Sequence, residues 1–479
     1  MAKRSGFDGD AIRRLGGELV ALLAETVDAE RADPVLRRVD GNELERRLSE
    51  PLPRTGQPIE DVLEAYRESV LAYARRNGHP RFLAYVCTSA DPVSVVGDAL
   101  ATALNQPVTA WRSSPSAMTI ERLVVKWMAE LTGFGTDGDG ALTSGGSMAN
   151  FHAMAAAVVE AERRAGFEPG SRHRLTMYLS REGHVSLRKA AHVLGVPPVQ
   201  VRLIGTDAER RLDIAALRDA VAQDVAAGLT PALVCTSAGT ANTGAIDPLD
   251  EVSSFCAGHR LWHHIDGSYG APAVLTDEYA WLSRAFAQAD SLSLDPHKWL
   301  FASPDAGCVL VRDANALTRA FSLFSEYTAV SETDPIESYA LFDRGLEMTR
   351  RFRGLKIWMI LKTRGSDALR DAIALNIELR RHLDSRIRAE AELEPLGSEL
   401  SIACFRYVPS RVPDGLTLDA LNRSIIETLL RDGRCYLSPT QLEGRYALRV
   451  CIVNYRTTKA DIDFVVDEVL RIGRRAVSA

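Results

Sequence analysis

The chain has 479 residues, and its 63 Asp and Glu residues outnumber its 57 Lys and Arg residues, which gives a net charge of −6 at pH 7. This balance offers no basic surface for nucleic acid, and no stretch approaches the roughly 18 consecutive apolar residues of a membrane helix, so we expect neither as a partner. The seven cysteines are scattered without a C-x-x-C pair, and the polar N-terminus lacks the apolar core of a signal peptide, which together predict a reducing, cytoplasmic location.

The first 90 residues are predicted to form a helical N-terminal segment. A Pro- and Gly-rich stretch, Pro51–Pro58, divides it and is typical of a linker. Amphipathic spacing predicts helices here and shortly beyond, at Ile12–Val27, Ile59–Arg75, Pro92–Leu104 and Ser116–Leu131.

Residues 91–360 are predicted to form a large α/β domain. Short apolar runs alternate with helical segments, and such runs indicate the buried strands of a mostly parallel sheet. The runs are Arg174–Ser180, Val199–Ile204, Ala232–Ser237, Leu261–Asp266, Ser291–Leu294 and Cys308–Val311. Ligands of such sheets bind beyond the carboxyl ends of the strands, so polar residues at those ends are candidate site residues.

Residues 361–479 are predicted to form a smaller α+β domain. Strands are expected at Ser401–Tyr407 and Ala447–Val453, a helix near Leu416–Arg431, and a last helix from Lys459. The whole chain therefore predicts a helical segment, a large sheet domain and a small C-terminal domain.

Lys298 is the first candidate for chemistry. Only seven of the 57 basic side chains are lysines, and this one lies between a strand-like run and the apolar residues Trp299, Leu300 and Phe301. Burial lowers the pKa of an amine, and a neutral amine can attack an aldehyde, which Arg cannot do. A lysine whose ammonium group reaches water remains the alternative for such a residue taken alone.

The segment Leu142–Asn150 predicts a strand, a turn of small residues and a helix. Free backbone N–H groups at the start of a helix bind anions, Gly146 allows a close approach, and Ser147 adds a hydroxyl group. The segment matches neither a Walker loop nor G-x-G-x-x-G, and a capped tight turn without a ligand stays open as an alternative.

Asp266 ends an apolar strand, where a carboxylate needs a charged or hydrogen-bonded partner. One interpretation is that it keeps a pyridine nitrogen protonated. The alternative is a metal site shared with His264 on the same strand face, although no third ligand lies at a suitable spacing, and we expect no metal.

Two further strand ends carry polar residues. His184 follows one strand and can stack on a flat ring or carry a proton. Thr240 and Asn242 follow another and are candidate contacts to a ring or a carboxylate, although a polar turn needs no function.

This ordered set of motifs resembles the group II pyridoxal 5'-phosphate (PLP)-dependent amino acid decarboxylases, the family of aromatic L-amino acid decarboxylase. The resemblance runs from about His79 to Arg456, and Asp295-Pro-His-Lys298-Trp is its most specific motif. Other matching segments are His79–Tyr85, Trp111–Pro115, Arg350–Trp358 and Arg445–Val450.

The resemblance implies PLP as the cofactor and a PLP-dependent transferase-like large domain of the aspartate aminotransferase type (fold type I). It implies that Lys298 holds PLP covalently, that Asp266 pairs with the pyridine nitrogen and that His184 stacks on the ring. The other expected cofactor contacts are Gly146, Ser147, Thr240, Asn242, Ser268 and Asp295.

Tyr327 falls where decarboxylases of this family carry a tyrosine and related aldehyde synthases carry a phenylalanine. The resemblance therefore implies loss of CO2 from an L-amino acid, with Tyr327 protonating Cα and His184 or His297 assisting. In the family the loop that carries this tyrosine reaches the active site of the partner subunit, which implies a homodimer with shared active sites and a dimer-forming N-terminal segment.

The expected substrate is an amino acid with an aromatic or medium-sized side chain. The aromatic enzymes line their pocket with large rings, whereas this chain retains one tyrosine among smaller residues. The expected pocket residues are Asn77, Tyr85, Val86, Pro107, Thr109 and Thr349. An aliphatic or acidic substrate stays open.

Three other functions remain as alternatives: an aldehyde synthase, an aminotransferase and a PLP-binding protein without turnover. Tyr327 argues against an aldehyde synthase, and the Asp-Pro-His-Lys motif argues against an aminotransferase. A PLP-binding protein without turnover is disfavoured because Lys298, Asp266, His184 and Tyr327 are all retained.

Overall fold

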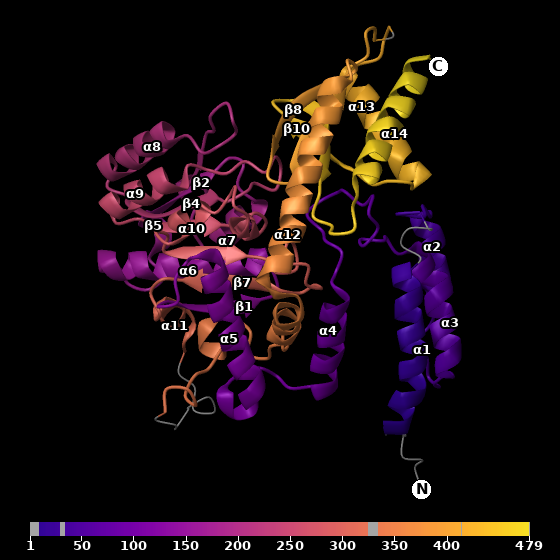
Figure 1. Ribbon diagram of the computed structural model, residues 1–479. Coiled ribbons are helices and arrows are strands. Elements are labelled where there is room, and N and C mark those ends of the chain that lie inside the picture. Colours follow the sequence, from indigo (N-terminus) through magenta and orange to yellow (C-terminus); the bar gives the residue numbers. More distant parts are fainter. Residues whose placement is uncertain (1–8, 29–33, 324–333, 413, 479) are drawn as a thin grey trace.

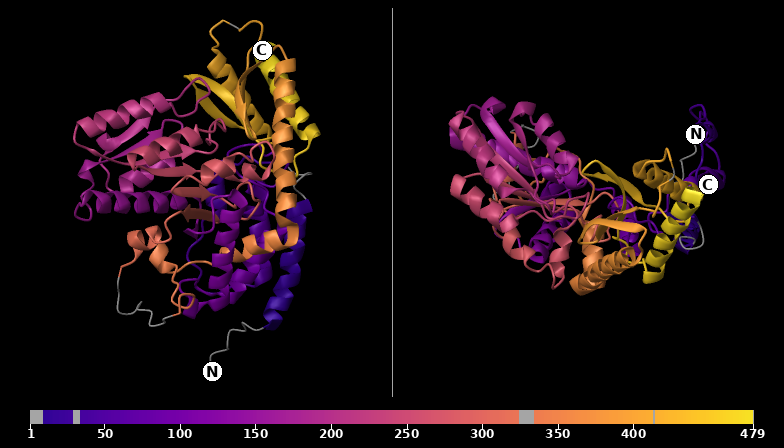
Figure 2. Two further views of the ribbon diagram at one scale, coloured as in Figure 1. Left: turned by 60° about the vertical axis from the view of Figure 1, so that its left-hand side comes forward. Right: turned by 90° about the horizontal axis from the view of Figure 1, so that it is seen from above.

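The computed structural model describes residues 9–28, 34–323, 334–412 and 414–478. The N-terminal helices lie at one side of the molecule, next to the C-terminal domain (Figures 1 and 2). They are α1 (Gly9–Asp28), α2 (Gly41–Leu48) and α3 (Ile59–Ser69), and α4 (Pro92–Leu104) follows. Among the described helices, none is long and apolar enough to cross a membrane.

Helix α3 ends six residues before the Arg75 that the sequence predicted. After Ser69 one short 3₁₀ turn follows, and Ala74 is extended, with φ −65° and ψ 135°. The prediction was wrong because tertiary contacts redirect the chain: the Arg75 guanidinium lies 4.9 Å from the centre of the Phe82 ring and 5.2 Å from that of Tyr85. Helical spacing alone carries no information about these partners.

A seven-stranded sheet forms the centre of the large domain. Its strands are β1 (Asp139–Thr143), β2 (Leu175–Ser180), β3 (Val201–Ile204), β4 (Thr230–Ser237), β5 (Trp262–Asp266), β6 (Ser291–Leu294) and β7 (Gly307–Val311). Their order is β1-β7-β6-β5-β4-β2-β3, and the pairs from β6 to β3 are parallel, whereas β7 runs antiparallel to both of its neighbours.

Helices cover both faces of this sheet, which explains its continuous apolar strands. On β4, Leu233 and Cys235 pack with helices α6 and α7, while Val234 packs with α8 and α9 on the opposite face. The helices of the domain are α5 (Pro115–Thr132), α6 (Gly146–Ala165), α7 (Val185–Val193), α8 (Ile214–Ala226), α9 (Leu249–His259), α10 (Leu282–Phe286) and α11 (Ala316–Phe321).

Helix α12 (Gly354–Ala389) connects the large domain to the small one (Figure 1). It has a break at Gly365, where φ is +74°, close to the boundary expected at 360/361. The small domain packs an antiparallel sheet against two helices. Its elements are β8 (Leu393–Glu399), β9 (Ile402–Tyr407), α13 (Leu418–Asp432), β10 (Ser438–Leu442), β11 (Arg445–Cys451) and α14 (Lys459–Ser478).

The parallel strands β2, β4, β5 and β6 end at the same edge of the sheet, where three of the predicted site motifs begin. His184 follows β2, Thr240 follows β4, and Asp266 is the last residue of β5. The fold thus brings together residues that are more than 80 positions apart in the chain.

Candidate active site

The first side of the site is the turn from β1 into α6. No side chain caps the start of α6, and Gly145 at this position accepts the N–H groups of Met148 and Ala149 through its carbonyl oxygen. The N–H groups of Gly146 and Ser147, the first two residues of the helix, therefore remain available to an anion. A Cβ on Gly146 would lie 2.3 Å from Ser268 Oγ, so only glycine permits this close approach.

Lys298 follows the end of β6, and its Nζ lies 2.9 Å from Asp295 Oδ2. Its side chain keeps 23% exposure. Burial lowers the pKa of this amine, as the sequence suggested, but the charge of Asp295, its hydrogen bond and the charge of Asp266 outweigh burial, so the net pKa is raised. The expectation of a lowered pKa was wrong because it left out these two carboxylates.

Asp266 is held as a carboxylate at the end of β5. Its Oδ1 accepts the Ser268 N–H at 3.1 Å and the Ser293 hydroxyl at 3.2 Å, and its Oδ2 accepts the Asn150 side-chain N–H at 2.9 Å. Burial raises the pKa of Asp266, but the hydrogen bonds from Ser268 and the charge of Lys298 lower it by more, so the net pKa lies below the usual value. The charged form therefore persists at neutral pH.

His184 lies at the start of α7, where its Nδ1 is 2.8 Å from the Ser186 hydroxyl. Thr240 is held in its turn by Thr243, whose hydroxyl lies 3.1 Å from its own. The Asn242 amide donates to Glu182 at 3.2 Å, and its oxygen accepts the Thr440 hydroxyl at 2.5 Å. The Asn242 side chain thus connects the two domains.

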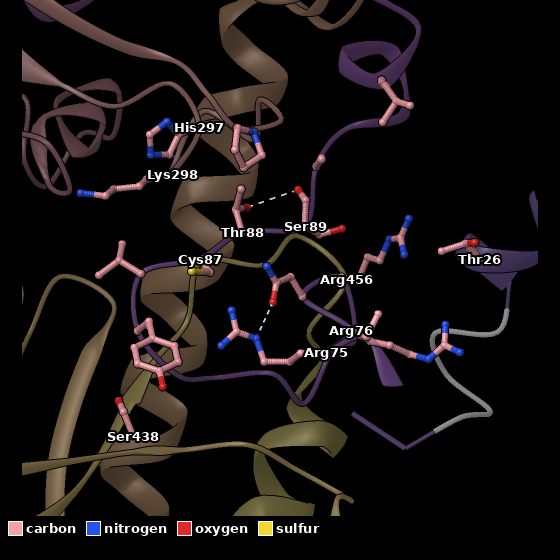
Figure 3. A pocket seen from close by; sticks show the side chains of 18 of the residues that line it. Thr26, Arg75, Arg76, Cys87, Thr88, Ser89, His297, Lys298, Ser438 and Arg456 are labelled. Carbon is pink, nitrogen blue, oxygen red and sulfur yellow. Dashed lines mark hydrogen bonds between the residues drawn. The ribbon is translucent and has the colours of Figure 1, made fainter. Parts of the chain in front are cut away.

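Most of the predicted residues line two adjoining cavities. The inner one, of about 370 Å³, is lined by Gly146, Ser147, His184, Thr240, Asp266, Ser268, Asp295, His297 and Lys298, among others. The outer one, of about 1230 Å³, includes Tyr85, Val86 and Asn242 and shares His184, His297 and Lys298 with the inner one. In Figure 3, Lys298 and His297 lie together at one side of the outer cavity, and Arg76 and Arg456 lie at the opposite side.

The remaining predicted residues lie elsewhere. Pro107 and Thr349 are exposed, and Thr109 is half-buried; none of the three lines either cavity within the described part of the chain. The segment with Pro107 and Thr109 lies beside Thr349, since the N–H of the intervening Val108 donates to the carbonyl of the next residue, Arg350, at 2.9 Å. Their role in the pocket stays a prediction. Tyr327 lies outside the described residues.

The metal alternative finds no support in the geometry around His264. Its Nε2 lies 3.0 Å from Asn150 Oδ1 and its Nδ1 lies 2.9 Å from Ser291 Oγ, so both ring nitrogens already have partners. Within the described residues, no group of three or more His, Cys, Asp or Glu side chains is placed to hold a metal ion.

Residues 42–408 match the family model of the pyridoxal-dependent decarboxylase conserved domain. The chain belongs to this family. The decarboxylase is 33% identical over 463 residues to an aromatic-L-amino-acid decarboxylase from Bacillus atrophaeus, covering 96% of this chain and 95% of that protein. It is 29% identical to a phenylacetaldehyde synthase from Petunia hybrida, over 93% of this chain and 91% of that protein.

The solved structures agree with this relationship. The decarboxylase matches the Oryza sativa TDC, solved with PLP and tryptamine, with a TM-score of 0.94, 27% identity and coverage of 99% and 100% of the two chains. The tryptophan decarboxylase of Catharanthus roseus, solved with L-tryptophan, matches with a TM-score of 0.91, 27% identity and coverage of 98% and 99%. The predicted family, the type I fold and the PLP cofactor are thereby confirmed.

The inner cavity of the decarboxylase has the donor set that PLP requires. The uncapped start of α6 suits the phosphate, the Asp266 carboxylate suits a protonated pyridine nitrogen, and the Lys298 amine suits the aldehyde. Asp295 Oδ1 is buried without a hydrogen-bond partner among the described atoms. The residues present therefore fit the cofactor.

Sequence reasoning missed two arginines and an asparagine. Arg75 and Arg449 line the outer cavity, and Asn150 lies buried behind the inner one. Arg449 donates to three backbone carbonyl groups, at distances of 2.5 to 3.0 Å, in the Thr240 turn and at Tyr85. Arg449 lies in the matching segment Arg445–Val450, and Asn150 ends the predicted turn segment Leu142–Asn150. The sequence therefore identified both segments but not the contacts of these two side chains.

Proposed function

We propose that this protein removes CO2 from an L-amino acid with an aromatic or medium-sized side chain and releases the corresponding amine. The observation that supports this most is the meeting of Lys298, Asp266, His184 and the start of α6 around one cavity that opens into a larger one. A cofactor pocket joined to a substrate-sized space is what such a reaction needs.

The positions of these residues support one set of proposed roles. Lys298 would hold the cofactor, Gly146 and Ser147 would bind its phosphate, Asp266 would pair with its pyridine nitrogen, and His184 would face its ring. When bound, PLP holds the substrate amine and takes up the electron pair that CO2 leaves at Cα. Other cofactor contacts that we propose are Thr240, Asn242, Ser268 and Asp295.

Two residues are proposed to complete the proton transfer. Tyr327 delivers a proton to Cα, as its place in the sequence implies. His297 is able to assist, because burial lowers its pKa and its Nδ1 accepts the Ala306 N–H at 3.0 Å. A neutral His297 therefore carries its proton on Nε2.

The outer cavity bears on the choice of substrate. Its lining combines Tyr85 with Arg75, Arg76, Arg449 and Arg456, and no Asp or Glu is present among the described residues that form it. A substrate with a cationic side chain would therefore lack a counter-charge. Relatives named for aromatic substrates favour an aromatic side chain, and Tyr85 offers a ring to pack against it.

We further propose a cytoplasmic homodimer. Helices α1 and α4 expose large apolar residues, including Val20 at 66%, Val96 at 52% and Leu104 at 54%, which water-exposed helices rarely carry as a group. Pro107 and Thr109 follow the end of α4, so a dimer formed through α4 would place them at the partner subunit. Seven free cysteines suit a reducing cytoplasm.

The test is to load purified protein with PLP and incubate it with individual L-amino acids while CO2, amine, aldehyde and peroxide are measured. We expect stoichiometric CO2 and amine from at least one aromatic amino acid. Lys298→Ala should abolish turnover and, because PLP itself absorbs between 300 and 450 nm, should shift the band of the cofactor in that range without removing it. Substantial activity in Lys298→Ala, or a wild-type protein that does not shift the band of added PLP, would refute the proposal.

A further inference from the structure

A buried network of hydrogen bonds lies behind the cofactor cavity and centres on Asn150 in the second turn of α6. This side chain is 1% exposed. Its Nδ2 donates to Asp266 Oδ2 at 2.9 Å and to Ser186 Oγ at 3.1 Å, and its Oδ1 lies 3.0 Å from His264 Nε2. One amide therefore contacts β5 twice and the start of α7 once.

The carboxylate of Asp266 determines how this amide is oriented. An ionised carboxylate only accepts hydrogen bonds, so the NH₂ group of Asn150 must face it and the amide oxygen must face His264. The oxygen only accepts, so His264 carries a proton on Nε2.

The protons on the His264 side follow in the same way. Burial lowers the pKa of His264 to about 4, against the opposing charge of Asp266, so the ring is neutral and its Nδ1 is bare. Nδ1 accepts the Ser291 hydroxyl at 2.9 Å, and Ser291 Oγ in turn accepts the Trp262 indole N–H at 2.8 Å. The three donors around His264, which are its own Nε2–H, the Ser291 hydroxyl and the Trp262 indole N–H, therefore each have an acceptor.

The second amide hydrogen of Asn150 determines the other branch. Ser186 Oγ accepts it at 3.1 Å and lies 2.8 Å from His184 Nδ1, and the Ser186 backbone N–H donates to the same nitrogen from 3.3 Å, so the Ser186 hydroxyl hydrogen is also available to it. Nδ1 of His184 is therefore an acceptor, and a neutral His184 carries its proton on Nε2.

We propose that Asn150 is a positioning residue that orients Asp266 directly and, by orienting the Ser186 hydroxyl, supports the Nε2-protonated tautomer of His184. The two residues line the same cavity and act on the same cofactor, yet they share no direct hydrogen bond. The roles of Asp266 and His184 in this inference rest on the proposed function, whereas the hydrogen-bond network does not.

Asn150→Leu separates this role from simple packing, because leucine has a similar volume and no polar atom. Asp266 loses one of its three donors, and the Ser186 hydroxyl, no longer oriented by the Asn150 amide, can rotate and accept a hydrogen bond from His184 Nδ1. Losing a hydrogen bond to a charged group corresponds to about ten-fold or more in an equilibrium constant. We expect the Kd for PLP to rise by at least about ten-fold.

The tautomer is read by ¹⁵N NMR of the PLP-loaded protein with labelled histidine, in which His184→Gln assigns the His184 signals. Protonated and bare ring nitrogens resonate far apart. Wild type should show His184 with its proton on Nε2, and Asn150→Leu should show a mixture of tautomers. Ser186→Ala should disturb the tautomer and leave the Kd for PLP within about three-fold, because Asn150 still binds Asp266.

Asn422→Leu is the matched control. Asn422 is also fully buried and makes three hydrogen bonds, but in the small domain, with Tyr407 and Leu418. It should lower stability without changing the tautomer or the Kd for PLP. If Asn150→Leu does not fold, the His184 tautomer measured in Ser186→Ala decides whether the inference stands.

The outcomes are distinct from those that test the proposed function. An unchanged His184 tautomer and an unchanged Kd in Asn150→Leu overturn the inference even if the wild type decarboxylates amino acids. An unchanged tautomer in Ser186→Ala does the same. A wild type with the expected tautomer but no decarboxylation refutes the proposed function and leaves the role of Asn150 standing.

Discussion

A single methyl group at Gly146 gives a direct test of the cofactor site. An ideal Cβ there would lie 2.3 Å from Ser268 Oγ, 2.8 Å from Ser268 Cβ and 2.8 Å from Asp295 Oδ2. Non-bonded heavy atoms reach their optimum at about 3.5–4.0 Å, so each approach is too short by roughly 0.7 Å or more. Rotating the Ser268 hydroxyl does not relieve the overlap, because its Cβ is also too close.

The cost of Gly146→Ala follows from these contacts. Forcing an extra carbon into a packed site costs about 1–3 kcal/mol. Ser268 must move, and its N–H holds Asp266 Oδ1 at 3.1 Å, so the partner of the pyridine nitrogen moves with it. We expect the free energy of unfolding to fall by about 1–3 kcal/mol and the Kd for PLP to rise by about 5- to 100-fold.

The assay is a titration of cofactor-free protein with PLP, followed by absorbance, together with urea unfolding. Gly258→Ala in α9 is the matched control, since no atom lies within 4 Å of its Cβ and the position is exposed. It should bind PLP as the wild type does and gain up to about 1 kcal/mol, because alanine favours helix over glycine. Wild-type affinity and stability in Gly146→Ala would show that α6 does not approach Ser268 so closely.

Three further predictions concern other parts of the molecule. Tyr327→Phe should shift the product from amine toward aldehyde and peroxide, and an unchanged ratio by chromatography would remove its role. Burial lowers the pKa of His152 to about 4. Between pH 6.5 and pH 4 the unfolded chain therefore binds a proton at this residue and the folded chain does not. The contribution of neutral His152 to the free energy of unfolding is complete above pH 6.5 and is lost as the pH falls toward 4. Urea unfolding at pH 7 and pH 5 should show that His152→Gln avoids about 2 kcal/mol of this loss, whereas equal losses in both proteins would contradict it. Arg449→Lys keeps the charge but cannot reach three carbonyl groups at once, so kcat/KM should fall by about ten-fold, mainly through KM, and wild-type kinetics would exclude a positioning role.

The local features of the site were predictable from the sequence. A strand followed by small residues and a helix predicted the turn at Gly146, and apolar runs ending in His184, Thr240 and Asp266 predicted three strand ends at one edge. These predictions succeeded because the spacing of apolar residues along a short segment distinguishes a strand from a helix, and because parallel strands end at a common edge of the sheet.

Contacts between distant segments were not predictable. The sequence placed a helix up to Arg75, but the rings of Phe82 and Tyr85 draw that arginine out of it. It also suggested a lowered pKa for Lys298 from its apolar neighbours, whereas the nearby carboxylates raise it. In both cases the deciding partner is a side chain whose position follows from the fold.

The sequence by itself determined the family, the type I fold and the PLP cofactor, because these depend on short motifs and on their order along the chain. Only the tertiary structure decided which oxygen of Asp266 meets Asn150, which nitrogen of His184 is bare, and that Pro107, Thr109 and Thr349 lie outside the cavities of their own chain. Hydrogen-bond direction and burial depend on atoms brought together from distant strands and helices, and no local pattern of residues contains that information.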